Sequence, residues 1–434
     1  MKNQILKSAL ILAFSGICAK SFDFIFRGFY SRHLGAEGMG LLALGFGLHG
    51  VMLTISTAGL GVAVSKIVSE YLEKNNLGAA GKSMRLSIYG VSVLSLCIIF
   101  LTFLFSGFIS EHLLSDPRIS AGICCLVPSV LFMGISYCLK GYFYASRKVS
   151  FPAISEFLEQ AVKFISITIL LKVFLPFGVE YGCAAVFAGI SIGEFSSCLF
   201  LSIFFLKDAK PLLTTKTNES NIPSAILKIS LPSMLSSATG SVLRMQEEVR
   251  IVTAFRQFGM SSADALSNLG LIHGMVMPML VFPLTLMGSV TTLLIPEISR
   301  RNTASNKIRL RRLIKKVYFL GIPTGVAIAA AVYIFPHFLS GLIYGRTDTV
   351  PFLKILSPLL PLMFADSLSC AILNGLGKQF SMMAYSITDC ALRLISIILF
   401  VPHFGINALI FIIVFSNIFT CLLTVAKVFK SSHA

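Results

Sequence analysis

Long apolar stretches alternate with short polar breaks along the whole chain of 434 residues. A helix that crosses the hydrocarbon core of a bilayer needs roughly 20 mostly apolar residues, and the stretches reach that length. The longest polar breaks, 207–223 and 299–316, are too short for soluble domains, which usually need at least about 50 residues. The pattern predicts an all-α membrane protein with about twelve transmembrane helices. The expected spans are 8–30, 40–68, 86–109, 120–139, 153–171, 183–206, 226–252, 266–294, 317–339, 355–374, 380–401 and 407–426.

Composition and charge agree with a membrane location. Hydrophobic residues make up 55% of the chain and charged residues 13%, whereas about a quarter of the residues of soluble domains are charged. If both termini are cytoplasmic, most of the 36 Lys and Arg residues fall in cytoplasmic loops, as the positive-inside rule requires. A dense cationic segment, 300–316, is interpreted as a topology determinant that contacts anionic membrane lipids, with a specific docking site as the alternative. The net charge of +17 therefore needs no nucleic acid as a partner.

The chain also matches itself at a spacing of about half its length, which is typical of transporters built from repeated helix bundles. Lys20 corresponds to Arg244 in this match, and His49 corresponds to His273. An even number of helices in each half makes the repeats parallel, so we expect two parallel six-helix bundles around a central cavity. The expected domains are an N-terminal bundle (1–206), a cytoplasmic linker (207–225) and a C-terminal bundle (226–434).

A stripe of charge is predicted on the first span. Lys20, Asp23 and Arg27 are spaced i, i+3 and i+7, which places them on one face of a helix. A charge in the middle of a bilayer costs roughly 2.5–3.5 kcal/mol on insertion scales, so it persists only when it is paired or useful. The cations Lys20 and Arg27 suit a phosphate or pyrophosphate group. Asp23 is a candidate for binding a coupling proton or sodium ion, with an ion pair to Arg27 as the structural alternative.

The seventh span carries a matching stripe. Arg244 and Arg250 are the candidate substrate-binding cations there, and Glu247 and Glu248 are the candidate ion-coupling acids. A structural pair of Arg244 with Glu248 at i, i+4 is the alternative. We favour a functional cavity, because a charged stripe recurs in both halves at mid-membrane depth.

Other polar residues within the spans have weaker assignments. Two further intramembrane charge pairs at i, i+4 could be self-neutralised and structural, or could belong to the cavity. They are Glu159 with Lys163, and Asp389 with Arg393. His49 and His273 lie among glycines, where helix packing is favoured over a proton relay.

The helix expected over 266–294 contains Pro278, Pro283, Gly274 and Gly288, which predict a kink or an interruption. Such a bend could be static or could act as a hinge in alternating access. The sequence has no HExxH, GxSxG or P-loop motif, and its ten cysteines show no CxxC spacing. We therefore expect neither an enzyme nor a metal or cofactor site.

Three strings resemble the stage V sporulation protein B group of polysaccharide-export proteins. They are SRHLGAEGMGLLAL (31–44), AGLGVAVSKIVSEYLEKNN (58–76) and LKGYFYASRKVSFPAISEFLEQAVKFI (139–165), with a fainter match at ILNGLGK (372–378). This group shares a superfamily with the lipid II flippases and the multidrug and toxin extrusion antiporters. The resemblance implies two six-helix bundles that move a polyprenyl-linked glycan outward across a bacterial cytoplasmic membrane. Longer relatives have two further helices, and Lys163 stands where the family more often has arginine.

The leading hypothesis is a flippase that translocates an undecaprenyl-pyrophosphate-linked sugar by alternating access. The sugar would be a cell-wall, spore-envelope or polysaccharide precursor. The alternatives are a cation-coupled antiporter for drugs or organic cations, and a membrane scaffold for envelope assembly that transports nothing. Cations at Lys20, Arg27 and Arg244 disfavour a pump for organic cations.

The expected topology can be tested by labelling. A cysteine introduced near Asp116 should react with an impermeant thiol reagent added from outside, and one near Asn306 should not, because the first position is expected outside and the second inside. Labelling of both positions, or the reverse pattern, would contradict cytoplasmic termini.

Overall fold

The computed structural model describes residues 2–57, 59–215, 217, 219, 221–303 and 307–433. Every regular element in these ranges is helical, so the predicted all-α class is confirmed. Nine of the described helical segments are long and apolar enough to cross a membrane. The chain is therefore a multi-pass membrane protein, while the count of twelve spans stays a prediction.

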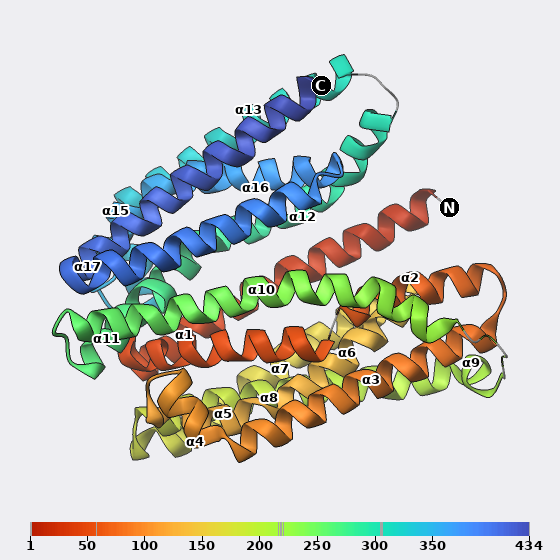
Figure 1. Cartoon of the computed structure of the whole chain (residues 1–434), viewed down its shortest axis with the longest axis horizontal. Coiled ribbons are helices and arrows are strands. Elements are labelled where there is room, and N and C mark those ends of the chain that lie inside the picture. Colours follow the sequence, from red (N-terminus) through yellow and green to blue (C-terminus); the bar gives the residue numbers. More distant parts are fainter. Residues whose placement is uncertain are drawn as a thin grey trace. The chain divides into compact units, whose positions relative to one another are not determined.

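Two of the nine segments are long enough to cross the membrane twice. They lie in α1 (Lys2–Thr57) and α17 (Gln379–His433), and their apolar parts are 44 and 53 residues long. At about 1.5 Å per residue, each exceeds twice the roughly 30 Å of a hydrocarbon core. Each bends at a glycine with positive φ, Gly35 at 67° and Gly405 at 58°. Figure 1 shows that α17 turns and runs back along itself. Both bends fall in loops that the sequence predicts.

The predicted span 40–68 is wrong as a single straight helix. It ends at Thr57, and a new helix, α2 (Leu60–Glu73), begins after Gly59. Gly59 has a φ of 68°, and a Cβ there would stand 2.8 Å from Cβ of Ser233. A left-handed backbone in a crowded place requires glycine, so tertiary packing sets this break.

The first compact unit comprises Met1–Ala19 and Leu44–Met245. Helix α8 is central to it and packs against α7, α6 and α5, with α7 as its main neighbour. Its core contains fully buried Met84, Phe143 and Leu201. Its helices are α2, α3 (Leu77–Leu104), α4 (Ser106–Phe108), α5 (Ser120–Leu126), α6 (Pro128–Ala145), α7 (Ser150–Phe174), α8 (Val179–Asp208), α9 (Lys210–Thr214) and most of α10 (Ile222–Gln257), with both ends of α1.

The second compact unit comprises Lys20–Ala43 and Gln246–Ala434. Its core is centred on Ile298, Ile372 and Val428. Besides the middle of α1 and the end of α10, it contains α11 (Ser262–Leu269), α12 (Met277–Thr303), α13 (Lys307–Ile334), α14 (Pro336–Tyr344), α15 (Val350–Leu356), α16 (Leu360–Gly375) and α17. Helices α1 and α10 thus contribute to both units, and the predicted bundles 1–206 and 226–434 stay a prediction.

The predicted interruption of the helix over 266–294 is present. A π-helical segment, Gly270–Val276, joins α11 to α12. The backbone of this segment lies close to the backbone of α1, since a Cβ on Gly270 would overlap the carbonyl oxygen of Ala36. The irregular turn therefore brings two backbones together within the second unit.

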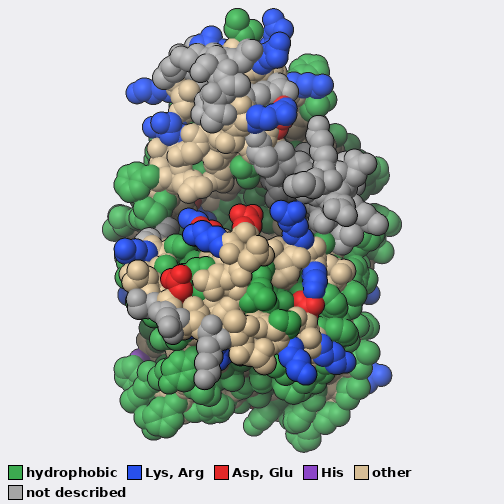
Figure 2. Space-filling view, turned by 90° about the vertical axis from the view of Figure 1, so that its right-hand side faces the viewer, with side chains coloured by type: hydrophobic (Ala, Val, Ile, Leu, Met, Phe, Trp, Pro, Cys, Tyr) green, Lys and Arg blue, Asp and Glu red, His purple; other side chains and the backbone are tan. Residues whose placement is uncertain are grey.

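Lys and Arg side chains outnumber Asp and Glu on the face shown in Figure 2, and hydrophobic side chains dominate its margins. In the cationic segment 300–316, Arg300 pairs with Glu297 at 2.8 Å, while Asn306 lies outside the described residues.

Asp116, the expected outside position for labelling, is 2% exposed and binds Arg118 through both carboxylate oxygens. The exposed neighbour Glu111 is therefore the better position for the outside cysteine.

We predict that the glycines at the α1 crossing determine the stability of the second unit. A Cβ on Gly40 would overlap the carbonyl oxygen of Leu266, so Gly40→Ala or Gly270→Ala should cost about 1–3 kcal/mol by overpacking. Gly90→Ala in α3 is the matched control, since no atom lies within 4 Å of its added Cβ. Thermal unfolding in detergent measures the effect, and equal stability of all three variants would contradict the close crossing.

Candidate functional site

The charged stripe of α1 lines a cavity of about 340 Å³ within the second unit. Lys20, Asp23 and Arg27 contribute from α1, as their spacing requires. His273 of the π-helical segment and Pro278 of α12 also line the cavity. The structure therefore brings two candidate cations, one candidate acid and one candidate relay histidine to one hollow.

The apolar wall of this cavity is built around an aromatic pair. The rings of Phe24 in α1 and Phe282 in α12 stack with centroids 4.3 Å apart. Phe24 adjoins Asp23 in the sequence, so the same helical turn supplies a polar and an apolar contact. An apolar wall beside a charged stripe suits an amphipathic ligand better than a fully hydrated ion.

Acidic residues lie near Arg27 but do not neutralise the other cation of the stripe, Lys20. Arg27 lies within electrostatic range of Asp23 and Glu248. Lys20 is exposed, and no ion pair joins it to any residue that the structure describes. In the described part of the chain, Lys20 is therefore the stripe cation best placed to meet an incoming anion.

Arg244 and Arg250 are both exposed on α10. Nη2 of Arg244 lies 3.7 Å from the ideal Cβ position of Gly240, one turn toward the start of the helix. The side chain thus runs away from Glu248, which lies one turn toward the end. This direction disfavours the structural pair of Arg244 with Glu248 that the sequence left open.

The end of α10 and the first arm of α17 form a buried ion network in the second unit. Arg393 binds Glu247 (Nη1 to Oε1, 3.2 Å) and Asp389 (Nε to Oδ2, 3.3 Å). The hydroxyl of Ser416 donates to Oδ1 of Asp389 at 2.5 Å. Glu247 is only 4% exposed, so its charge requires a partner of this kind. The sequence predicted the pair of Asp389 with Arg393 but not its link to Glu247.

A second charge cluster lies in the first unit. Nζ of Lys163 lies 3.5 Å from Oε1 of the buried Glu159. Glu194 of α8 is also buried and lies within electrostatic range of Glu159. Glu194 was not among the predicted site residues, because no oppositely charged residue lies one helical turn from it.

The two histidines, which correspond in the internal repeat, have different surroundings. Nε2 of His49 lies 2.8 Å from Oγ of Ser129, whose hydroxyl hydrogen is donated to the carbonyl oxygen of Leu126 at 2.6 Å. The histidine must therefore be the donor, which fits the favoured packing role. His273 instead lines the charged cavity.

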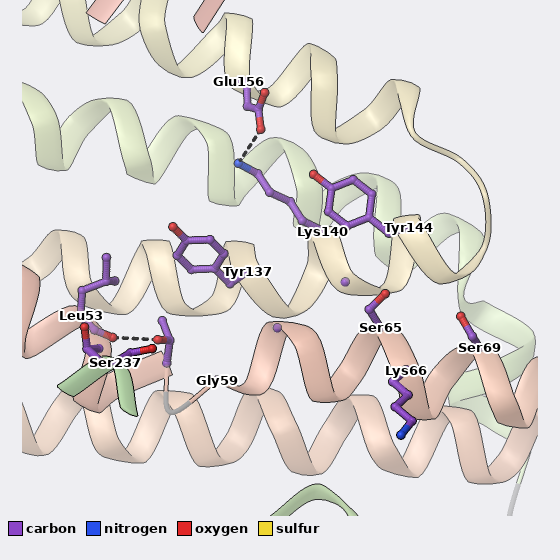
Figure 3. Close-up of a pocket in the computed structure, with 14 residues that line it drawn as sticks. Leu53, Gly59, Ser65, Lys66, Ser69, Tyr137, Lys140, Tyr144, Glu156 and Ser237 are labelled. Carbon is purple, nitrogen blue, oxygen red and sulfur yellow. Dashed lines mark hydrogen bonds and ion pairs between the residues drawn. The ribbon is translucent and has the colours of Figure 1, made fainter. Parts of the chain in front are cut away.

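A larger cavity, of about 840 Å³, lies in the first unit between α1, α2, α6, α7 and α10. It is lined by Lys66, Lys140, Glu156, Tyr137 and Tyr144, among others, and Figure 3 shows these side chains around it. None of these residues was a predicted site residue. The polar spacing of Tyr137, Lys140 and Tyr144 on α6 was the signal that could have found this face of the cavity.

A model of the polysaccharide biosynthesis protein family matches residues 5–302. The chain belongs to this family. It is 26% identical to stage V sporulation protein B of Bacillus subtilis, over 99% of this chain and 84% of that protein. It is 24% identical to the lipid II flippase MurJ of the same organism, over 87% and 74% of the two chains. The expected resemblance is thus confirmed.

Solved structures support the fold of this polysaccharide biosynthesis protein. A multidrug resistance MATE family transporter of the MOP superfamily, in its inward-facing conformation, superposes with a TM-score of 0.77 at 16% identity. That match covers 97% of this chain and 99% of the transporter. A MOP superfamily transporter from Pyrococcus furiosus, described as having a binding pocket of reversed polarity, superposes with a TM-score of 0.68 at 14% identity. At these identities the comparison establishes the fold alone.

The network around Arg393 predicts a stability effect in this family member. Arg393→Leu should cost about 3–5 kcal/mol, because Glu247 and Asp389 would remain buried without their shared cation. Adding Glu247→Gln to that variant should restore part of the loss by removing one unpaired charge, and Arg393→Lys should lose less. Unfolding in detergent checks this, and a wild-type midpoint for Arg393→Leu would show that the network is dispensable.

Proposed function

We propose that the chain is a flippase that moves an undecaprenyl-pyrophosphate-linked sugar outward across a bacterial cytoplasmic membrane. The observation that carries the proposal is the cavity beside α1, where Lys20 and Arg27 face an apolar wall inside a membrane-spanning segment. Membership of the polysaccharide biosynthesis protein family and similarity to a protein named a lipid II flippase support the same substrate class.

The chemistry of the cavity matches a lipid diphosphate. A pyrophosphate diester carries about two negative charges, and an unpaired charge in a poorly solvated site costs several kcal/mol, so more than one cation must meet it. Lys20 and Arg27 lie on one face of α1, two turns apart. Arg244 is proposed as a third cation and Arg250 as a flanking one, because both are exposed on α10.

Coupling is assigned to the acids beside these cations. Asp23 lines the cavity, and Glu248 lies within electrostatic range of Arg27. A proton or sodium ion bound at these carboxylates would change the charge that the substrate meets. Glu247 is the less direct candidate, since Arg393 already binds it. His273 is a candidate proton relay at the cavity wall.

The competing transporter is a multidrug antiporter, and the MATE fold is compatible with it. A cavity for organic cations should present acids and aromatic rings without cations. The α1 cavity contains Phe24, Phe282 and Asp23, but Lys20 and Arg27 would repel a cationic drug. We therefore favour the anionic lipid. A scaffold that transports nothing would require none of these residues for lipid binding.

The proposal predicts a preference for the diphosphate. Lys20→Gln, Arg27→Gln and Arg244→Gln, made singly in folded and membrane-inserted protein, should each weaken binding of a polyprenyl-pyrophosphate by about 1.5–3 kcal/mol, the scale of a charge-assisted hydrogen bond. Binding of the matching polyprenyl alcohol should not change. The measurement is the dissociation constant of each of the two lipids for each variant, determined in detergent.

Two controls sharpen the measurement. Arg244→Lys keeps the charge and should recover part of the affinity. Arg346→Gln alters a half-buried arginine that pairs with Asp348 outside the membrane-spanning segments and should change nothing. If every glutamine variant retains the wild-type preference for the diphosphate, the stripe is an internal brace and the proposal fails.

A further inference from the structure

The cavity of the first unit has a chemistry different from that of the α1 stripe. Hydroxyl groups converge on it from α1, α2, α6 and α10, and its volume is about 840 Å³. Cavities of roughly 300–1,000 Å³ hold ligands of drug size, and a disaccharide falls in that class. The lining hydroxyl residues are Thr54, Thr57, Ser65, Ser69, Tyr137, Tyr144 and Ser237.

Helix α6 presents one polar and aromatic face to this cavity. Tyr137, Lys140 and Tyr144 are spaced i, i+3 and i+7, so they lie on one side of the helix, as Figure 3 shows. Close packing of α2 against α6 keeps this face in place, because a Cβ on Gly141 would stand 2.9 Å from the carbonyl oxygen of Gly61. The two tyrosines are 44% and 38% exposed, so their rings remain accessible.

Several hydroxyls in the cavity have no competing interaction within the protein. Ser65, Ser69, Tyr137 and Tyr144 make no side-chain hydrogen bond to any residue in the described part of the chain. Each can both donate and accept a hydrogen bond. Closely spaced groups of this kind match the vicinal hydroxyls of a sugar, and aromatic rings provide an apolar surface for its carbon face.

The charges of this cavity are largely balanced. Nζ of Lys140 lies 3.5 Å from Oε1 of Glu156, which leaves Lys66 as the cation without an ion pair among the described lining residues. A balanced, hydroxyl-rich cavity suits a neutral polar ligand better than a diphosphate or an organic cation. Glu156 and Lys140 add an acceptor and a donor of the stronger, charge-assisted kind.

We propose that this cavity binds the sugar portion of the lipid-linked substrate, with Tyr137 and Tyr144 as ring-stacking residues and the Lys140–Glu156 pair as the polar anchor. The proposal rests on the flippase function proposed above and adds a second subsite to it. The stripe of α1 would recognise the diphosphate, and the cavity of the first unit would recognise the glycan.

A tryptophan reporter can test this subsite directly, because the chain contains no tryptophan. Tyr144→Trp places the fluorophore in the cavity, and Tyr89→Trp places it on an exposed position of α3 outside the cavity as the control. The probes are a polyprenyl-pyrophosphate that carries an N-acetylhexosamine disaccharide and the same lipid without sugar. The sugar-bearing lipid should shift the emission of the Tyr144→Trp reporter alone, and the bare lipid should shift neither.

A second variant separates this subsite from the diphosphate site. Tyr137→Ala should weaken binding of the sugar-bearing lipid by about tenfold, the scale of a lost ring contact and hydrogen bond, and leave the bare lipid unaffected. A retained sugar preference with a silent Tyr144→Trp reporter would overturn the subsite while the flippase proposal stood. If Tyr137→Ala loses affinity for both lipids equally, Tyr137 supports the fold or the diphosphate site, and the glycan subsite would also be overturned. If the wild type binds neither lipid, the flippase proposal fails and the subsite with it.

Discussion

The high cost of placing a charge in hydrocarbon is the constraint on which this structure depends. Every ionisable group within a membrane span must find a counter-charge, a hydrogen-bond partner or a polar cavity. Arg393 meets this requirement for Glu247 and Asp389 together. Lys20 meets it differently, since it borders a cavity and no ion pair to it occurs among the described residues. The contrast separates charges that are paired within the protein from a charge that borders a cavity.

Two kinds of polar cavity follow from this distinction. The one beside α1 combines Lys20 and Arg27 with stacked phenylalanines, which suits an amphipathic anion. The one in the first unit combines serine and tyrosine hydroxyls with a balanced ion pair, which suits a neutral glycan. A lipid-linked sugar contains both chemistries, joined through its diphosphate. The proposed function therefore accounts for both cavities with one substrate class.

Periodicity predicted the local features well. The i, i+3, i+7 spacing placed Lys20, Asp23 and Arg27 on one face, and the structure has them along one cavity. The bends at Gly35 and Gly405 fall in predicted loops. Contacts between distant segments were beyond such reasoning. Glu247 pairs with Arg393 across a long stretch of sequence, and the break at Gly59 depends on Ser233. The spacing of Tyr137, Lys140 and Tyr144 marks a polar face on α6, but nothing in the local pattern indicates which helices enclose a cavity with it.

Transport in reconstituted vesicles tests the central claim most directly. Purified protein is placed in liposomes with a polyprenyl-pyrophosphate disaccharide in the inner leaflet, and an impermeant glycosidase reports arrival of the sugar outside. The account predicts faster exposure with the wild type than with empty vesicles, and little acceleration with a Lys20→Gln, Arg27→Gln double variant that inserts and unfolds like the wild type. Exposure no faster than in empty vesicles, combined with export of an organic cation by the same protein, would contradict it.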